Sequence, residues 1–204
     1  MEKKLNYHKR LLEIVDNLDY RPKVLLHSCC GPCSTTVIDF LVKYFDVTVF
    51  YYNPNIEPKE EYEKRKKEQI RFIKEYNNDK VNMIDSEYEN DKFAKLTKGL
   101  ENEPEGGARC AVCFKIRLEK TAQKAKAEGY DYFATTLTVS PYKNCDTINK
   151  IGYVLEKQYG VKYLCGDFKK EEGYKKSINF SKEYNLYRQD YCGCHYAHNK
   201  KIES

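Results

Sequence analysis

Nine cysteines occur in this chain of 204 residues, and seven of them fall into three short groups. Thiolates are the form of cysteine that binds metals and carries redox chemistry. A spacing of two intervening residues lets two sulfurs converge on one metal or cluster, as in zinc, iron–sulfur and dithiol redox sites. A dithiol of the thioredoxin kind would leave most of the grouped cysteines unexplained, so the pattern favours metal binding. The groups are Cys29-Cys30-x-x-Cys33, Cys110-x-x-Cys113 and Cys192-x-Cys194.

Seven thiols exceed the four that a zinc site or a four-iron cluster takes. The adjacent residues Cys29 and Cys30 are expected to have diverging side chains, and Cys192-x-Cys194 converges only if Gly193 allows a tight turn. We therefore hypothesise two neighbouring metal centres, each with one thiol from the adjacent pair and one from the C-x-C pair. Zinc in a structural role would account for this number of thiols. A catalytic site favours iron instead, because zinc has no redox chemistry.

The remaining cysteines and the histidines have simpler interpretations. Cys145 and Cys165 stand alone and are interpreted as structural. His27 either supports the neighbouring thiols through a hydrogen bond or packs at a strand end. His195 and His198 lie near the end of the chain and are expected to be exposed rather than to bind a metal.

Composition indicates one globular domain over residues 1–204, with a mild excess of positive charge. The chain has 36 Lys and Arg against 31 Asp and Glu, a formal charge of +5, which permits nucleic-acid binding without requiring it. No apolar run approaches the ~20 residues of a transmembrane helix, and the first residues lack the apolar core of a secretory signal. We expect a cytoplasmic protein with no membrane partner, where reduced thiols serve metal or redox chemistry rather than disulfides.

The elements that must position the thiols alternate between short apolar runs and amphipathic helical patterns. The runs at 24–26, 47–52, 81–84, 132–136 and 161–164 predict strands, and helical spacing occupies most of the intervals between them. This alternation predicts an α/β fold with a parallel five-stranded sheet and helices on both faces. From Asp167 onward the periodicity weakens, and residues 167–204 are expected to form a basic, cysteine-containing segment that closes the site.

The first thiol group lies where the first strand ends and a helix begins, and Ser34 to Thr36 is expected to open that helix. In an open α/β sheet, ligands bind outside the carboxyl ends of the strands. A helix N-terminus also favours thiolate over thiol. The sequence therefore predicts a site at this edge of the sheet.

Five motifs, which span about residues 24–196, together resemble the epoxyqueuosine reductases of the QueH type. The motifs are Leu25-Leu26-His27-Ser28-Cys29-Cys30-Gly31-Pro32-Cys33, Tyr51-Tyr52-Asn53-Pro54-Asn55-Ile56, Arg109-Cys110-Ala111-Val112-Cys113-Phe114-Lys115-Ile116-Arg117-Leu118, Thr135-Thr136-Leu137-Thr138-Val139-Ser140-Pro141-Tyr142-Lys143, and Phe168-Lys169-Lys170 through Tyr187-Arg188-Gln189-Asp190-Tyr191-Cys192-Gly193-Cys194.

The resemblance implies a HUP-like fold, related to the PP-loop enzymes that modify tRNA. It implies the last step of queuosine biosynthesis, in which the epoxide of epoxyqueuosine at the wobble position of a tRNA anticodon is reduced to queuosine. It also implies a [4Fe-4S] cluster beside a mononuclear iron, a tRNA substrate and an external electron donor. The resemblance also implies a departure, because some members of the family carry aspartate at the position of Cys33, and a thiolate is expected there in this chain.

On this resemblance we assign Cys30, Cys110, Cys113 and Cys192 to the cluster and Cys29, Cys33 and Cys194 to the mononuclear iron, with the members of each close pair interchangeable. A proton donor is required as well, and Asp190 and Tyr142 are the catalytic candidates, with Tyr191 as a further one. RNA contact is expected from basic residues, with Tyr174 or Tyr142 stacking on an unpaired base, against the alternative of a solvated basic helix face. These basic residues are Lys143, Lys169, Lys170, Lys175, Lys176 and Arg188.

Two other functions stay open on the sequence. One is a cluster-dependent tRNA thiolase that uses ATP, although the turn after the first strand is not the Gly-rich phosphate turn that such an enzyme needs. The other is a zinc-stabilised RNA-binding module without catalysis. Nucleotide binding and the identity of the bound metal separate these from the reductase.

Overall fold

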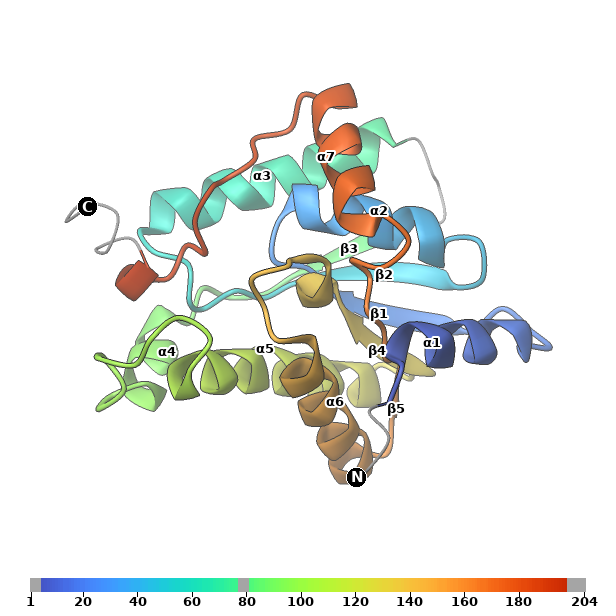
Figure 1. Cartoon of the computed structure of the whole chain (residues 1–204), viewed down its shortest axis with the longest axis horizontal. Helices are drawn as coiled ribbons and strands as arrows, with labels where there is room; N and C mark the ends of the chain where they lie inside the picture. Colours follow the sequence, from blue (N-terminus) through green and yellow to red (C-terminus); the bar gives the residue numbers. More distant parts are fainter. Residues whose placement is uncertain (1–4, 77–80, 198–204) are drawn as a thin grey trace.

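The computed structural model describes residues 5–76 and 81–197, and these residues contain a sheet of five parallel strands in the order β3-β2-β1-β4-β5 (Figure 1). The sequence-based prediction of a parallel five-stranded sheet is therefore confirmed. The strands are β1 (Lys23–His27), β2 (Asp46–Tyr51), β3 (Val81–Asp85), β4 (Tyr132–Thr135) and β5 (Lys162–Tyr163).

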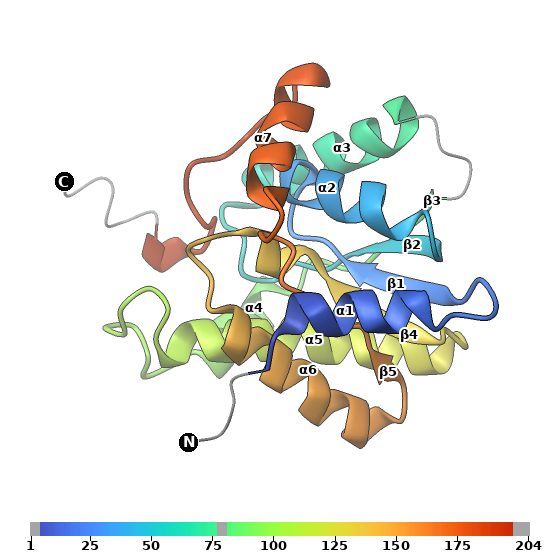
Figure 2. The same cartoon turned by 45° about the vertical axis from the view of Figure 1, so that its right-hand side comes forward.

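Helices cover both faces of the sheet, as predicted. Alternate residues of β1 enter two separate cores, because successive side chains of a strand point to opposite faces. Val24 and Leu26 pack in the core with α1, α2 and α3, whereas Leu25 packs in the core with α5 and α6. Figures 1 and 2 show α2, α3 and α7 on one side of the sheet and α4, α5 and α6 on the other. The helices are α1 (Tyr7–Asp16), α2 (Gly31–Leu41), α3 (Lys59–Glu75), α4 (Asn90–Leu96), α5 (Ala108–Ala127), α6 (Cys145–Tyr159) and α7 (Gly173–Glu183), with a 3-10 helix η1 (Thr136–Val139).

The strand order reverses between β1 and β4, which makes the space beyond their carboxyl ends a topological switch point. His27 is in register with Phe50 of β2 and with Thr135 of β4. The segments after these three strands therefore leave the sheet side by side. Ligands of open α/β sheets bind in such a crevice.

Two helices differ from their predicted bounds for physical reasons. α2 begins at Gly31 rather than Ser34, because Pro32 lies in its first turn, where the missing N–H of proline costs no hydrogen bond. α7 lies where weak periodicity predicted no clear element. It buries Gly173, Ser177 and Ser181, four residues apart, so it packs with small polar residues and lacks an apolar stripe.

The segment after α7 runs beside α3 and ends on the same side of the molecule as the loop before α5 (Figures 1 and 2). This course brings the third thiol group back to the sheet edge where the first two begin. Among the described residues, no helix combines the length and apolar character needed to cross a membrane.

Candidate functional site

The first thiol group forms a compact cluster at the junction of β1 and α2. The sulfurs of Cys29, Cys30 and Cys33 all lie within 4.8 Å of one another, and those of Cys29 and Cys30 are 3.8 Å apart. The expectation that the two adjacent side chains diverge is therefore wrong. Cys30 is the N-cap of α2 in an extended conformation, and Gly31 already belongs to the helix. The chain therefore changes direction here, and the side chains do not alternate between two faces as they would in a strand.

This cluster offers soft sulfur donors in a buried position. Cys30 is fully buried and Gln189 Nε2 donates a hydrogen bond to its sulfur at 3.0 Å. Hydrogen bonds from Cys30 and Cys33 hold the pKa of Cys29 well below its usual value, while hydrogen bonds to Cys29 and Cys30 raise the pKa of Cys33. One thiolate stabilised by two thiols is a donor set that fits zinc or iron–sulfur chemistry, which soft ligands select.

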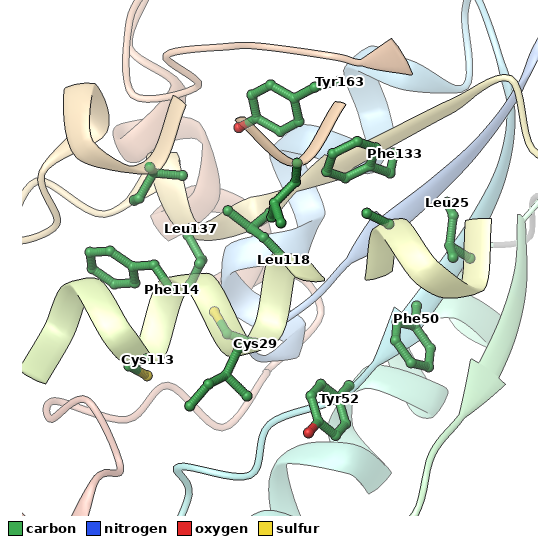
Figure 3. Packing of buried hydrophobic residues seen from close by; sticks show 14 of the residues in the cluster. Leu25, Cys29, Phe50, Tyr52, Cys113, Phe114, Leu118, Phe133, Leu137 and Tyr163 are labelled. Atoms are coloured by element: carbon green, nitrogen blue, oxygen red, sulfur yellow. The ribbon is translucent and has the colours of Figure 1, made fainter. Parts of the chain in front are cut away.

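The second thiol group occupies the first turns of α5. The Gly106 amide donates to the Cys110 sulfur at 3.2 Å, which shows how the preceding loop supports this cysteine. Cys113 is buried in the same apolar cluster as Cys29, and Figure 3 shows both at the end of that cluster away from Leu25. Burial raises the pKa of Cys113 to about 12, and the neighbouring thiols Cys192, Cys194 and Cys110 contribute to the increase.

The third thiol group is held in place by α3. Arg65 Nη1 donates to the Cys192 carbonyl at 3.1 Å, and Arg65 Nε donates to Glu61 at 2.6 Å in a buried ion pair. Gly193 has a φ of +90°, and a Cβ at this position would lie 2.8 Å from the Arg65 guanidinium. The tight turn that the sequence analysis required of Gly193 is therefore present, and only glycine fits it without displacing Arg65.

A cavity of about 530 Å³ opens beside the thiols and collects residues from four segments. Cys33 and Cys192 reach its wall from the first and third thiol groups. The cavity is thus adjacent to the sulfur cluster and is open to a ligand from outside. The candidate residues that line it are Cys33, Tyr142, Lys143, Arg188, Asp190 and Cys192, together with Tyr174, Gln189 and Tyr191.

Two of the six predicted basic residues line this cavity, two line another hollow, and Lys175 and Lys176 line neither. Lys143 and Arg188 line the cavity, and the Arg188 guanidinium lies 5.3 Å from the centre of the Tyr174 ring. Burial opposes the charge of Lys143, but the thiols of Cys192, Cys29 and Cys33 raise its pKa above the usual value. Lys169 and Lys170 line a separate hollow of about 460 Å³ beside α6, and Lys169 pairs with Asp167 at 2.6 Å.

The proton-donor candidates lie on the outer part of the cavity. Tyr142 is 78% exposed, and Asp190 is exposed on the segment that leads to Cys192. Both groups can reach a bound ligand, and neither is buried among the thiols.

His27, Cys145 and Cys165 are packed within the fold, whereas His195 is exposed. His27 is fully buried between Thr135 Oγ1 at 3.0 Å and the Tyr52 carbonyl at 3.1 Å, and burial lowers its pKa to about 3, so it packs as a neutral strand-end histidine. His195 is exposed beside Glu57, and His198 lies outside the described residues. Cys145 begins α6 and Cys165 is fully buried after β5.

Sequence reasoning missed two arginines and a glutamine that contact the thiol groups. Arg65 and Gln189 are described above, and Arg117 lies buried on α5, one turn after Cys113. A usable signal existed for the arginines. Each follows a site or ion-pair residue by four positions, Glu61 before Arg65 and Cys113 before Arg117, which places both members of a pair on one helix face.

The chain is similar to known proteins over most of its length. Residues 24–200 match the family model described as "Epoxyqueuosine reductase QueH". Curated proteins with that name from Staphylococcus epidermidis and Streptococcus pyogenes are 48% and 44% identical, each match covering 95% of this chain and 85% and 78% of the relative. The protein with that name from Thermotoga maritima is 40% identical over 84% of this chain and 88% of its own length.

Proposed function

The chain belongs to the QueH family of epoxyqueuosine reductases, and we propose that it reduces the epoxide of epoxyqueuosine in tRNA to the alkene of queuosine. This is an oxidoreductase reaction of queuosine biosynthesis. Its balance is one epoxide, two electrons and two protons, which become one alkene and one water. The electrons come from an external donor, and the protein must bind the modified base and deliver at least one proton to the departing oxygen.

The observation that carries this proposal is the meeting of three thiol groups with a basic cavity at one sheet edge. Cys33 and Cys192 line the same cavity as Lys143 and Arg188. The positive side chains suit the phosphates of an RNA strand, and the thiols suit a redox metal centre. Neither feature alone distinguishes a reductase from an RNA-binding module, but their adjacency supports the proposal that electrons are transferred beside the bound RNA.

The thiols fit the iron groups implied by the family, because the triad of Cys29, Cys30 and Cys33 contains sulfur donors and no carboxylate. Bound there, such groups would supply one-electron transfer and a Lewis-acidic metal position. We propose that Cys30, Cys110, Cys113 and Cys192 hold a [4Fe-4S] cluster and that Cys29, Cys33 and Cys194 hold a separate iron. The convergence of Cys29 with Cys30 supports treating these two as interchangeable.

The remaining cavity residues bind the substrate and move protons. Lys143 and Arg188 would pair with anticodon phosphates, and the Tyr174 ring beneath Arg188 offers a face on which an unpaired base can stack. Asp190 is the first candidate for the acid that protonates the epoxide oxygen, with Tyr142 as the second. The segment of residues 184–197 contributes Arg188, Asp190 and Cys192 to the cavity lining, which supports the closing role proposed for the C-terminal segment of residues 167–204.

The test is anaerobic reconstitution of the full chain with iron and sulfide, followed by incubation with epoxyqueuosine-containing tRNA and a chemical reductant. Nucleoside mass spectrometry should show loss of epoxyqueuosine and an equal gain of queuosine. Full activity of a protein that contains zinc and no iron would contradict the proposed centres. Reconstituted protein that binds this tRNA but never converts it would contradict the reductase function.

The rival functions predict different results in the same preparations. A thiolase would bind ATP, yet the β1–α2 turn, where PP-loop enzymes bind phosphate, is occupied here by the buried sulfurs of Cys29 and Cys30. A zinc-stabilised RNA-binding module would be colourless and would leave epoxyqueuosine intact.

A further inference from the structure

A buried guanidinium lies between the first two thiol groups. Arg117 is 2% exposed, and its Nε donates to the carbonyl of Cys113 at 3.4 Å while Nη1 donates to Asn53 Oδ1 at 3.5 Å. Asn53 in turn donates from Nδ2 to the carbonyl of Ser28 at 2.8 Å, immediately before Cys29. Arg117 is thereby tied to Cys113 on one side and, through Asn53, to the turn that carries Cys29 on the other.

The interactions of Arg117 leave its charge largely uncompensated by protein groups. Both hydrogen bonds are long, and Nη2 has no partner among the described residues. The buried Arg65 provides a contrast, because it forms an ion pair with Glu61 at 2.6 Å. A buried charge without a partner is costly, so a residue such as Arg117 is expected only where an anion compensates it.

The thiols near Arg117 are the groups whose ionisation would compensate its charge. Burial lowers the Arg117 pKa, but Cys113, Cys192, Cys29 and Cys110 together raise it above the usual value. These cysteines come from all three thiol groups, so Arg117 faces the centre that the groups would form. Its partnerless Nη2 retains N–H donors that no described protein acceptor uses.

We propose that Arg117 compensates the negative charge of the metal centre held by the three thiol groups and thereby raises the reduction potential of that centre. The inference rests on the proposed function, because it requires a redox-active group at the thiols. Each one-electron reduction by the external donor adds one negative charge to the site. A cation in a buried, weakly polarisable environment stabilises this added charge more strongly than an exposed cation does.

The test compares Arg117→Gln and Arg117→Lys with the unmodified protein after anaerobic reconstitution with iron and sulfide. Lys115→Gln is the matched control, since Lys115 is an exposed cation on the same helix. The midpoint potential is measured by spectroelectrochemical titration, with the absorption and EPR spectra of the reduced state as independent readouts. We expect the glutamine variant to lower the equilibrium constant for one-electron reduction at least tenfold, which corresponds to about 59 mV. The midpoint potential of Arg117→Lys should stay close to that of the unmodified protein, and the midpoint potential of Lys115→Gln should be unchanged.

Each result decides a separate point. An unchanged midpoint in an iron-loaded Arg117→Gln protein overturns the inference and leaves the proposed function standing. Absence of any iron–sulfur signal in the unmodified protein overturns both. If Arg117→Gln fails to retain iron, the iron content of Arg117→Lys decides the role of the charge. Normal iron content in the lysine variant supports that role, and loss of iron from it as well overturns that role.

Discussion

Cys33 links the sulfur cluster to the cavity, because its side chain belongs to the triad and also lines the cavity wall. It lies in the first turn of α2, where it packs against the core that buries Cys30 and stays partly exposed. A residue that is both a proposed metal ligand and part of the cavity wall is expected to affect metal content and substrate binding together. It is also the position at which some resembling sequences carry a carboxylate.

Replacing Cys33 with alanine should remove the separate iron and leave the cluster in place. Iron per chain should fall while acid-labile sulfide stays unchanged, because the proposed cluster ligands are all retained. Cys145→Ser is the matched control, since burial raises the pKa of Cys145 to about 11 and keeps it a neutral thiol that hydrogen-bonds to the Gly166 carbonyl. Equal losses of iron and sulfide in Cys33→Ala would show that Cys33 belongs to the cluster instead.

Asp190 is the residue for which a proton-transfer role is most directly testable. Asp190→Asn should lower single-turnover epoxide reduction by about a hundredfold or more, the usual contribution of a positioned general acid, with iron and sulfide unchanged. Glu105 offers a comparison because it is another carboxyl group that lines the cavity. If Glu105→Gln slowed the reaction and Asp190→Asn did not, the acid would be Glu105.

At the level of elements, α3 is the support on which the C-terminal segment rests. Its Arg71 donates to the carbonyls of Tyr184 and Asn185, both at 2.9 Å, and its Glu68 accepts a hydrogen bond from the Tyr187 amide at 2.7 Å. Arg65 of the same helix makes a further contact of this kind, the hydrogen bond to the Cys192 carbonyl. Helix α3 therefore sets the path of a segment that has no regular structure of its own between α7 and Cys192.

The two arginines of α3 should differ in importance because one is buried and the other is half-exposed. Arg65→Gln leaves Glu61 buried without its partner and should reduce the free energy of unfolding by about 3 kcal/mol. Arg71→Gln removes pairs at the surface and should cost about 1 kcal/mol or less. Denaturant unfolding of the metal-free, reduced proteins measures both values.

The same two variants test positioning of the third thiol group. In metal-free protein, Cys194 should be alkylated faster in Arg65→Gln than in Arg71→Gln, as followed by mass spectrometry of peptides. Similar alkylation rates in the two variants would mean that the Cys192–Cys194 turn is held by its other contact, the hydrogen bond from the Glu57 amide to the Gly193 carbonyl.

At the level of the whole molecule, positive side chains extend from the cavity along the neighbouring surface. Lys143 and Arg188 line the cavity. Lys169 and Lys170 line the adjacent hollow, whose wall also includes Asn144 and Cys145 at the start of α6. An RNA loop whose modified base enters the cavity would continue over this hollow. On the proposed function, the tRNA surface would therefore include residues that do not line the cavity.

Charge reversal at Lys169 and Lys170 should weaken tRNA binding without affecting the iron content. The slope of log K against log salt should become shallower by about 1.4, which is 0.7 for each single-strand phosphate that these lysines no longer neutralise. The matched control is the double reversal Lys126→Glu and Lys157→Glu, which changes the net charge equally in the last turns of α5 and α6, at the opposite edge of the sheet. Equal weakening by both pairs would indicate an effect of net charge alone.

The sequence by itself determined the sheet, most helices and the edge at which the chemistry lies. These properties depend on local patterns: apolar runs make the strands, and the thiol groups stand at the ends of strands or the starts of helices. Family membership was also readable, because five motifs lie along nearly the whole chain. Such features depend only on residues that are close in the sequence, and the periodicity of apolar residues reveals them directly.

Tertiary structure alone decided which groups meet. The convergence of Cys29 with Cys30 depends on the strand-to-helix turn, and the separation of Lys143 from Lys169 depends on which segment lines which hollow. α7 escaped prediction because it packs through small residues against α2. The spacing from Cys113 places Arg117 on the same helix face, but its contact with Asn53 joins distant segments and could not be read from the sequence. In each case the interaction joins groups that only the folded chain brings together. The strength of such an interaction depends on how deeply the groups are buried, and sequence spacing does not give that burial.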